Sequence, residues 1–171
     1  MKRTLALLIA LFPFGCMNAG TLELGSDVPS VEVADQSAEV VKLSQAGADG
    51  WTLVYFYPKA DTPGCTKQAC SLRDSYEQLT ERGVQVYGVS RDSVADQKAF
   101  AEKYKLPFSL LADTEGTLME AFGVPALAGK TLPTRQAFLF KEGKLVWKDE
   151  AASTDEQAAD ILKVLNEGSL N

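Results

Sequence analysis

The sequence contains no histidine among its 171 residues. Histidine often activates a nucleophilic cysteine and is a common metal ligand, so its absence excludes Cys-His catalysis and His-ligated metal sites. Cysteine is scarce as well, and the three present are too few for the dense disulfide framework of a small secreted scaffold. The apolar runs are all too short to be taken for a membrane-spanning helix. Reactivity is therefore expected from cysteine, arginine and hydroxyl groups.

The chain carries more acidic than basic residues, 23 against 17, which gives a formal charge of −6. An acidic protein repels phosphate backbones, so we expect no nucleic-acid partner. The hydrophobic fraction of 46% and the length are those of one ordinary globular domain.

The first residues have the composition of a targeting segment. Lys2 and Arg3 precede an apolar stretch over residues 5–14, and small or polar residues follow. This pattern is typical of a secretory signal peptide. We predict a signal peptide over residues 1–19, a mature domain over residues 21–171, and export to the periplasm.

Cys16 offers a second interpretation of this segment, a lipid anchor on a new N-terminal cysteine. The preceding Pro13, Phe14 and Gly15 fit a bacterial lipid-attachment motif poorly. Both interpretations leave Cys65 and Cys70 as the free thiols, because Cys16 is either removed or acylated.

Strand and helix patterns alternate along the rest of the chain. Runs rich in β-branched and aromatic residues predict strands, and longer runs with apolar residues at helical spacing predict helices. The expected strands are 31–33, 40–43, 51–57, 84–89, 108–111, 136–141 and 144–148, and the expected helices are 66–82, 93–104, 114–122 and 154–166. This order predicts an α/β fold with a central mixed sheet, helices on both faces and an N-terminal β-hairpin.

Cys65 and Cys70 follow an aromatic strand and a turn, at the point where a helix begins. A cysteine at a helix N-terminus faces unpaired backbone N–H groups and the positive end of the helix dipole. Both favour the thiolate, which is the nucleophilic form of cysteine. The segment is therefore predicted to be a reactive thiol site.

Pro58, Thr62 and Cys65 form the pattern Pro-x-x-x-Thr-x-x-Cys after this strand. On this motif the sequence resembles the peroxiredoxins, which are thiol peroxidases of thioredoxin-like fold. Cys70, five residues further on, makes it similar to the bacterioferritin-comigratory or Q-type subgroup. Segments 24–29, 71–74 and 135–140 also resemble the family, so the likeness covers nearly the whole mature chain.

The resemblance implies a role for five residues. Cys65 would attack the peroxide, Cys70 would resolve the product as a redox-active disulfide, Thr62 would orient the peroxide, Pro58 would shield the thiolate, and Arg135 would supply a cation. A helix dipole contributes only about 0.3–1 kcal/mol, so Arg135 and hydrogen bonds to sulfur are expected to provide most of the activation.

The spacing of the two cysteines has a conformational consequence. Residues five apart on an intact helix have Cα atoms about 8–9 Å apart, whereas a disulfide needs about 7 Å or less. Forming the Cys65–Cys70 bond therefore requires the start of the helix to unwind, and we expect order to be lost between Thr62 and Leu72 on oxidation.

The resemblance further implies hydrogen peroxide and organic hydroperoxides as substrates, a thioredoxin-like reductant, no cofactor, no metal and a monomeric chain. Two other functions stay open on the sequence. One is an exported thiol–disulfide oxidoreductase of the same fold, although the C-x-x-C motif of such enzymes is missing. The other is a noncatalytic binding module held by a static Cys65–Cys70 disulfide.

Overall fold

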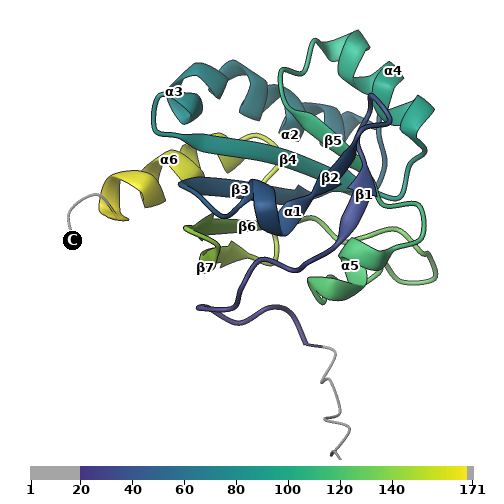
Figure 1. Cartoon of the computed structure of the whole chain (residues 1–171). Helices are drawn as coiled ribbons and strands as arrows, with labels where there is room; N and C mark the ends of the chain where they lie inside the picture. Colours follow the sequence, from purple (N-terminus) through teal and green to yellow (C-terminus); the bar gives the residue numbers. More distant parts are fainter. Residues whose placement is uncertain (1–19, 169–171) are drawn as a thin grey trace, which may run out of the picture.

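The structure is a computed structural model that describes residues 20–168, and five of its strands form one central sheet (Figure 1). The sheet has the order β5-β4-β3-β6-β7. Its strands are β3 (Trp51–Phe56), β4 (Val84–Ser90), β5 (Ser109–Ala112), β6 (Gln136–Lys141) and β7 (Lys144–Asp149). β3, β4 and β5 are parallel, and β6 and β7 are each antiparallel to the strand before them in the sheet.

β3 is the middle strand and is buried on both faces. Leu53 and Tyr55 contribute to one hydrophobic cluster, and Val54 and Phe56 contribute to the other. This alternation follows from the strand period of two, because successive side chains point to opposite faces of the sheet. An uninterrupted apolar and aromatic run is therefore what this position requires.

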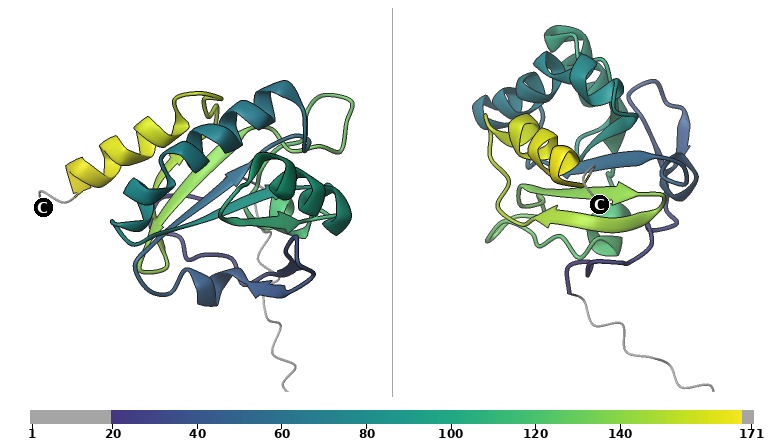
Figure 2. Two further views of the ribbon diagram at one scale, coloured as in Figure 1. Left: turned by 90° about the horizontal axis from the view of Figure 1, so that it is seen from above. Right: turned by 90° about the vertical axis from the view of Figure 1, so that its left-hand side faces the viewer.

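Helices cover both faces of the sheet, and the longer helices share one face. The helices packed in the cluster with Tyr55 are α2 (Pro63–Asp74), α3 (Tyr76–Thr80), α4 (Val94–Tyr104) and α6 (Gln157–Gly168). The opposite face is covered by α1 (Leu43–Ala46), α5 (Thr117–Ala121) and the hairpin strands β1 (Glu32–Ala34) and β2 (Val40–Lys42). Figure 2 shows α2 and α6 lying side by side over the sheet. The predicted fold class is confirmed.

The N-terminal hairpin forms a two-stranded sheet of its own. One isolated bridge, between Asp35 and Leu111, joins it to β5 at the edge of the central sheet. The sequence predicts the hairpin correctly but not this separation. The predicted signal peptide, residues 1–19, lies outside the described residues, and its division from the domain stays a prediction.

The predicted helix over residues 66–82 is wrong at its start and in its middle. α2 begins at Pro63, because proline at the first helical position lacks only an N–H group that would have no partner there. Ser75, with φ −104° and ψ 9°, leaves helical geometry and separates α2 from α3. The earlier start places Cys65 inside the first turn of α2.

Candidate active site

Cys65 lies in the first turn of α2, directly beyond the end of β3. Thr62 precedes the helix in extended conformation, and no side chain caps the helix start. The first N–H groups of a helix have no partner in a preceding turn, so they remain available to a ligand. The Cys65 side chain is only 2% exposed, which keeps bulk water from the sulfur. A buried thiol at an uncapped helix N-terminus is the centre of the site.

Arg135 reaches this sulfur from the neighbouring strand. β6 runs antiparallel to β3, with Gln136 opposite Phe56, so the residue before β6 lies next to the chain that leaves β3. Arg135 Nη2 donates a hydrogen bond to Cys65 Sγ at 3.4 Å. Sheet register thus brings together two residues that are far apart in the sequence. It places a fixed positive charge beside the thiol, because arginine stays protonated at neutral pH.

Two glutamines hold the guanidinium in place, and the sequence analysis missed both. Gln68 is fully buried in α2 and accepts a hydrogen bond from Arg135 Nη1. Gln68 Nε2 in turn donates to Gln157 Oε1 at the start of α6, at 2.5 Å. Helical spacing could have indicated Gln68, because it lies three residues after Cys65 on the same face. Nothing in the sequence marks Gln157, since only the packing of α2 against α6 brings it there.

Gly64 makes the close approach of Arg135 feasible. A Cβ atom on Gly64 would lie 3.3 Å from Arg135 Nη2 and 3.5 Å from a methyl group of Thr154. Any side chain at this position would press on the guanidinium from the side of α2. The glycine before Cys65 therefore serves packing of the arginine.

Thr62 and Pro58 lie in the turn between β3 and α2. Thr62 Oγ1 donates its only proton to the Lys59 carbonyl oxygen at 2.9 Å. In this conformation the hydroxyl is free only to accept a further hydrogen bond. Pro58 is half-buried where the chain leaves β3. The geometry places both residues in the turn next to Cys65.

Cys70 lies further along α2, is half-buried, and is a free thiol, as is Cys65. The residues between them are helical, so the two thiols do not form a disulfide in this structure. The redox-active disulfide remains a prediction.

A chain of hydrogen bonds connects the turn between β3 and α2 with β4 and α4. The Ala60 backbone N–H donates to Asp92 Oδ2 at 2.7 Å, and Ser90 Oγ donates to the same oxygen at 2.7 Å. Gln97 Nε2 donates to Ser90 Oγ at 2.8 Å, and Tyr57 Oη donates to Gln97 Oε1. Burial raises the pKa of Tyr57 well above its ordinary value, so this phenol stays a neutral donor. The network ties the active-site turn to β4 and α4.

Within residues 20–168, no group of histidine, cysteine and carboxylate side chains has the arrangement of a metal site. Over the same residues, no helix has the length and apolarity needed to cross a membrane. The larger surface hollows lie away from Cys65, one of 580 Å³ between β7 and α6 and one of 680 Å³ beside α3 and β4.

Comparison with known proteins identifies the family. The AhpC/TSA family profile matches residues 24–148. The chloroplastic peroxiredoxin Q of Oryza sativa subsp. japonica is 43% identical over 127 residues, which are 74% of this chain and 58% of the rice protein. That of Sedum lineare is 44% identical over 122 residues, or 71% of this chain and 65% of that protein. The chain thus spans less than two thirds of the length of these relatives.

Solved structures give the same result. Peroxidoxin BcpB from Mycobacterium tuberculosis is 35% identical, with a TM-score of 0.79 over 85% of this chain and 97% of that chain. A bacterioferritin comigratory protein from Xanthomonas campestris is 28% identical, with a TM-score of 0.76 over 87% of this chain and 98% of that chain. The predicted family resemblance and thioredoxin-like fold are confirmed.

The predicted export to the periplasm is contradicted by the same comparison, because the similar plant proteins are chloroplastic. The expectation depended on residues 1–19 alone, where a basic and apolar composition suggested a leader. Such a composition does not specify a compartment by itself, and Cys16, the alternative lipid anchor, lies outside the described residues. By profile, relatives and fold together, the chain belongs to the AhpC/TSA family, in its peroxiredoxin Q or bacterioferritin-comigratory subgroup.

Proposed function

We propose that this protein is a thiol-dependent peroxidase in which Cys65 reduces hydrogen peroxide and organic hydroperoxides. The observation that carries the proposal is the hydrogen bond of 3.4 Å from Arg135 Nη2 to Cys65 Sγ, at the uncapped start of α2. A positive charge beside one buried sulfur at a helix N-terminus can stabilise the negative charge that moves during attack on a peroxide. Membership of the peroxiredoxin family supports the same conclusion.

In the first step the Cys65 thiolate attacks one peroxide oxygen. An S–O bond forms, the O–O bond breaks, and its electron pair leaves with the second oxygen as hydroxide or alkoxide, which takes up a proton. The sulfur is oxidised to sulfenic acid and the peroxide is reduced to water or an alcohol. Arg135 and the α2 N–H groups stabilise the charge that moves along the O–O axis, in the manner of an oxyanion hole.

Thr62 and Pro58 have supporting roles in this step. Because Thr62 Oγ1 donates to the Lys59 carbonyl oxygen, its lone pairs can accept the O–H of the peroxide and fix its orientation. Pro58 covers the turn beside the thiolate and limits access of water. The half-buried position of both residues supports these assignments.

In the second step the Cys70 thiol attacks the Cys65 sulfenic acid. An S–S bond forms, the S–O bond breaks, and the hydroxyl leaves as water with the thiol proton. Helical geometry keeps the two sulfurs apart in the reduced protein, so residues 62–72 unwind before this step. A thioredoxin-type dithiol then reduces the disulfide and is itself oxidised. Because both thiols lie in one chain, a monomer completes the cycle.

The two cysteine variants test the proposal. Cys65→Ser is expected to abolish peroxide consumption, and Cys70→Ser is expected to make one turnover and then to consume peroxide only slowly, by overoxidation of Cys65. The measurements are peroxide consumption over time and mass spectrometry of samples in which the reaction is stopped by alkylating the free thiols. Full activity of Cys65→Ser would refute the proposal. Disulfide-linked dimers in the oxidised wild type would contradict the monomeric cycle.

A further inference from the structure

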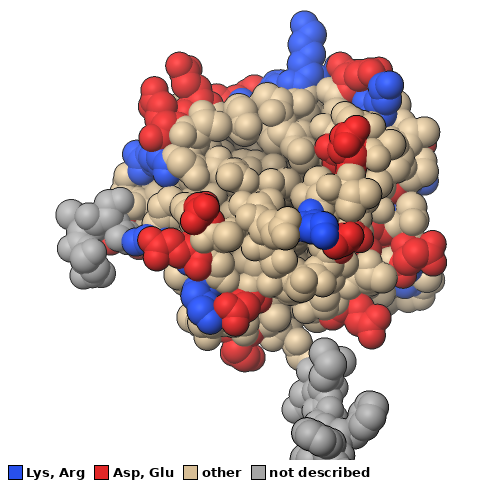
Figure 3. Space-filling model, in the orientation of Figure 1, with Lys and Arg blue, Asp and Glu red and all other residues tan. Residues whose placement is uncertain are grey.

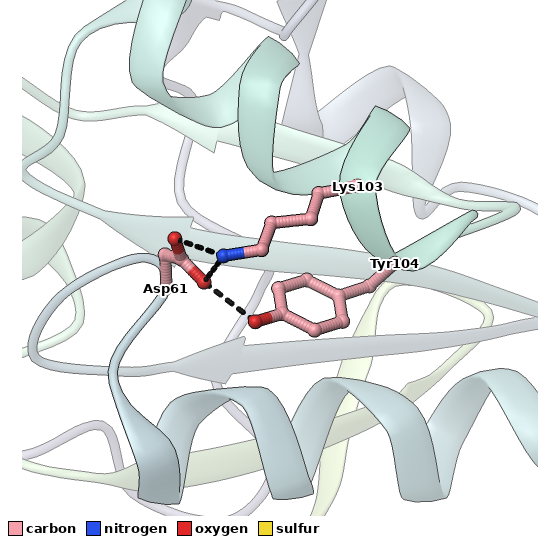
Figure 4. A network of polar contacts seen from close by, with 3 residues as sticks. All are labelled: Asp61, Lys103 and Tyr104. Atoms are coloured by element: carbon pink, nitrogen blue, oxygen red, sulfur yellow. Dashed lines mark hydrogen bonds and ion pairs between the residues drawn. The ribbon is translucent and has the colours of Figure 1, made fainter.

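The C-terminal end of α4 contacts both ends of the segment that carries the two cysteines. Lys103 Nζ donates to both carboxylate oxygens of Asp61, at 2.8 and 2.7 Å, and Tyr104 Oη donates to Asp61 Oδ1 at 2.6 Å (Figure 4). At the other end of the segment, Arg73 Nη1 donates to the Tyr104 carbonyl oxygen at 2.8 Å. We call Lys103 and Tyr104 the α4 clamp.

The two points of attachment flank the residues that have to move. Asp61 immediately precedes Thr62, and Arg73 immediately follows Leu72, so the clamp lies just outside the segment that unwinds for the disulfide. The other tethers of α2 start within that segment and would break with it. They include the bond from Gln68 to Gln157 and the bond from Ser71 Oγ to the Asp155 carbonyl oxygen.

We propose that the α4 clamp stays closed in both redox states and confines unwinding to residues 62–72, which keeps Cys70 near Cys65 for resolution. The inference depends on the proposed peroxidase cycle. Tyr104 and Lys103 are positioning residues, because they act on the cysteines through Asp61 and Arg73.

Chain geometry allows the disulfide to form while the clamp is closed. Twelve residue steps separate Asp61 from Arg73; ten of them lie within α2 and cover about 15 Å, and the two steps before Pro63 add at most about 7 Å. With Cys65 and Cys70 bonded, their Cα atoms lie about 5.5 Å apart, and the seven remaining steps can extend over about 24 Å. The chain with the disulfide formed can therefore still span the distance between Asp61 and Arg73 in the reduced protein. Both attachments can therefore persist through oxidation.

The clamp residues are placed for this role by α4 itself. The helix packs Phe100 into the core, and the Tyr104 ring packs against Phe100 with centroids 5.3 Å apart. Lys105 ends the helix in left-handed conformation, with φ 53°, so the Tyr104 carbonyl oxygen is free to accept from Arg73. Asp61 also has a left-handed backbone, with φ 56°, which turns its carboxylate toward α4.

Two variants weaken the clamp at its Asp61 end without changing the fold. Tyr104→Phe keeps the ring and the carbonyl oxygen and removes only the hydroxyl bond to Asp61. Asp61→Asn removes the charge, and asparagine tolerates the left-handed backbone. The matched control is Tyr87→Phe, which removes a hydroxyl bonded to Gln85 Oε1 at 3.1 Å, on β4 and outside the clamp.

The first measurement is the competition between resolution and overoxidation in the full-length protein. A second peroxide oxidises the sulfenic acid to sulfinic acid whenever Cys70 is slow, so the ratio of sulfinic acid to disulfide reports the resolution rate. The loss of an exposed ion pair or hydrogen bond should alter such a ratio by about 1.4- to fivefold. We expect both clamp variants to raise it by that factor and Tyr87→Phe to leave it unchanged. An unchanged or lower ratio in both clamp variants overturns the clamp.

The second measurement is amide exchange in reduced and oxidised protein. In the wild type, oxidation should remove protection from residues 62–72 and leave α4 and residues 57–61 as before. In Tyr104→Phe the loss should spread to residues 57–61. Loss of protection there in the oxidised wild type would show that the clamp opens, and would overturn the inference.

The wild type separates failure of the clamp from failure of the proposed function. If wild-type Cys65 forms neither sulfenic acid nor disulfide with peroxide, the peroxidase cycle fails, and the clamp fails with it. If the wild type forms the disulfide and the variants match it in both measurements, the cycle stands and only the clamp is wrong.

Discussion

Arg135 is the residue on which the proposed chemistry of Cys65 depends most directly. It contacts the sulfur at 3.4 Å, it is held by Gln68, and Gly64 leaves it room. Gln68 and Gly64 both belong to α2, whereas Arg135 lies in the chain before β6, so the contact joins two separate parts of the fold. Removing the charge should therefore act on reactivity more than on folding.

We predict that Arg135→Met lowers the rate constant of Cys65 oxidation by about 10²-fold, the usual cost of losing one donor of an oxyanion hole. Arg135→Lys should recover part of the loss, because it restores the charge but not the paired N–H groups. Stopped-flow peroxide reduction measures both. Arg82→Met serves as control, since Arg82 is exposed and bonds Asn166. A rate within a factor of about two of the wild type in Arg135→Met would remove Arg135 from the mechanism.

At the scale of elements, α2 has two kinds of neighbour. Gln68 on its buried face bonds Gln157 of α6, and Ser71 bonds the Asp155 carbonyl oxygen just before α6. Asp61, two residues before α2, and Arg73, near its end, both contact α4. The helix that is proposed to unwind partly is thus attached at both flanks. The sequence predicts a helix here but not its partners, because contacts between helices depend on how each lies on the sheet.

The contact of Asp61 with α4 should depend on pH. Hydrogen bonds from Lys103 and then Tyr104 hold the pKa of Asp61 below its ordinary value. A carboxylate with a lowered pKa contributes stability that is complete above the ordinary value of about 4 and is lost as the pH falls through the lowered one. We predict that the stability difference between wild type and Asp61→Asn shrinks below about pH 4. Urea unfolding at several pH values measures it, and a constant difference would contradict the ion pair.

At the scale of the whole molecule, the central sheet separates the face covered by α2, which carries Cys65, from the opposite face covered by α1 and α5. Phe122, at the end of α5, is fully buried and contacts Phe56, Phe138 and Phe140, with ring centroids 5.2, 5.1 and 5.9 Å away. These rings lie across the sheet from α2. Around this core, acidic and basic side chains are interspersed over the surface seen in Figure 3, and no basic patch forms on that side.

We predict that Phe122→Ala lowers the free energy of unfolding by about 3–5 kcal/mol, because it leaves a cavity between aromatic rings. The rate of Cys65 oxidation in the folded protein should stay as in the wild type, since the ring does not reach α2. Urea unfolding and stopped-flow kinetics on the same samples test both parts. Phe122→Leu provides a milder variant, and a change in rate without a change in stability would contradict the separation of the two faces.

The sequence by itself determined the central strand, the reactive segment and the family. Residues 51–57 predict a buried strand because they are mostly apolar and aromatic, of strand length, and followed by Pro58. Pro58, Thr62 and Cys65 are close enough in sequence for their spacing to be visible. Such features are local, and strand and helix periods report them directly. The same locality misled the interpretation of residues 1–19, whose composition alone suggested export to the periplasm.

The tertiary structure decided what lies around the sulfur. Arg135 is 70 residues from Cys65 in sequence, and Gln157 is 89 from Gln68. The family resemblance had suggested Arg135, but only the antiparallel pairing of β3 with β6 places its guanidinium on the sulfur. The α4 clamp and the role of Gln157 were not visible at all. Contacts of this kind depend on strand order and helix packing. These bring together residues that are distant in sequence and that no local pattern connects.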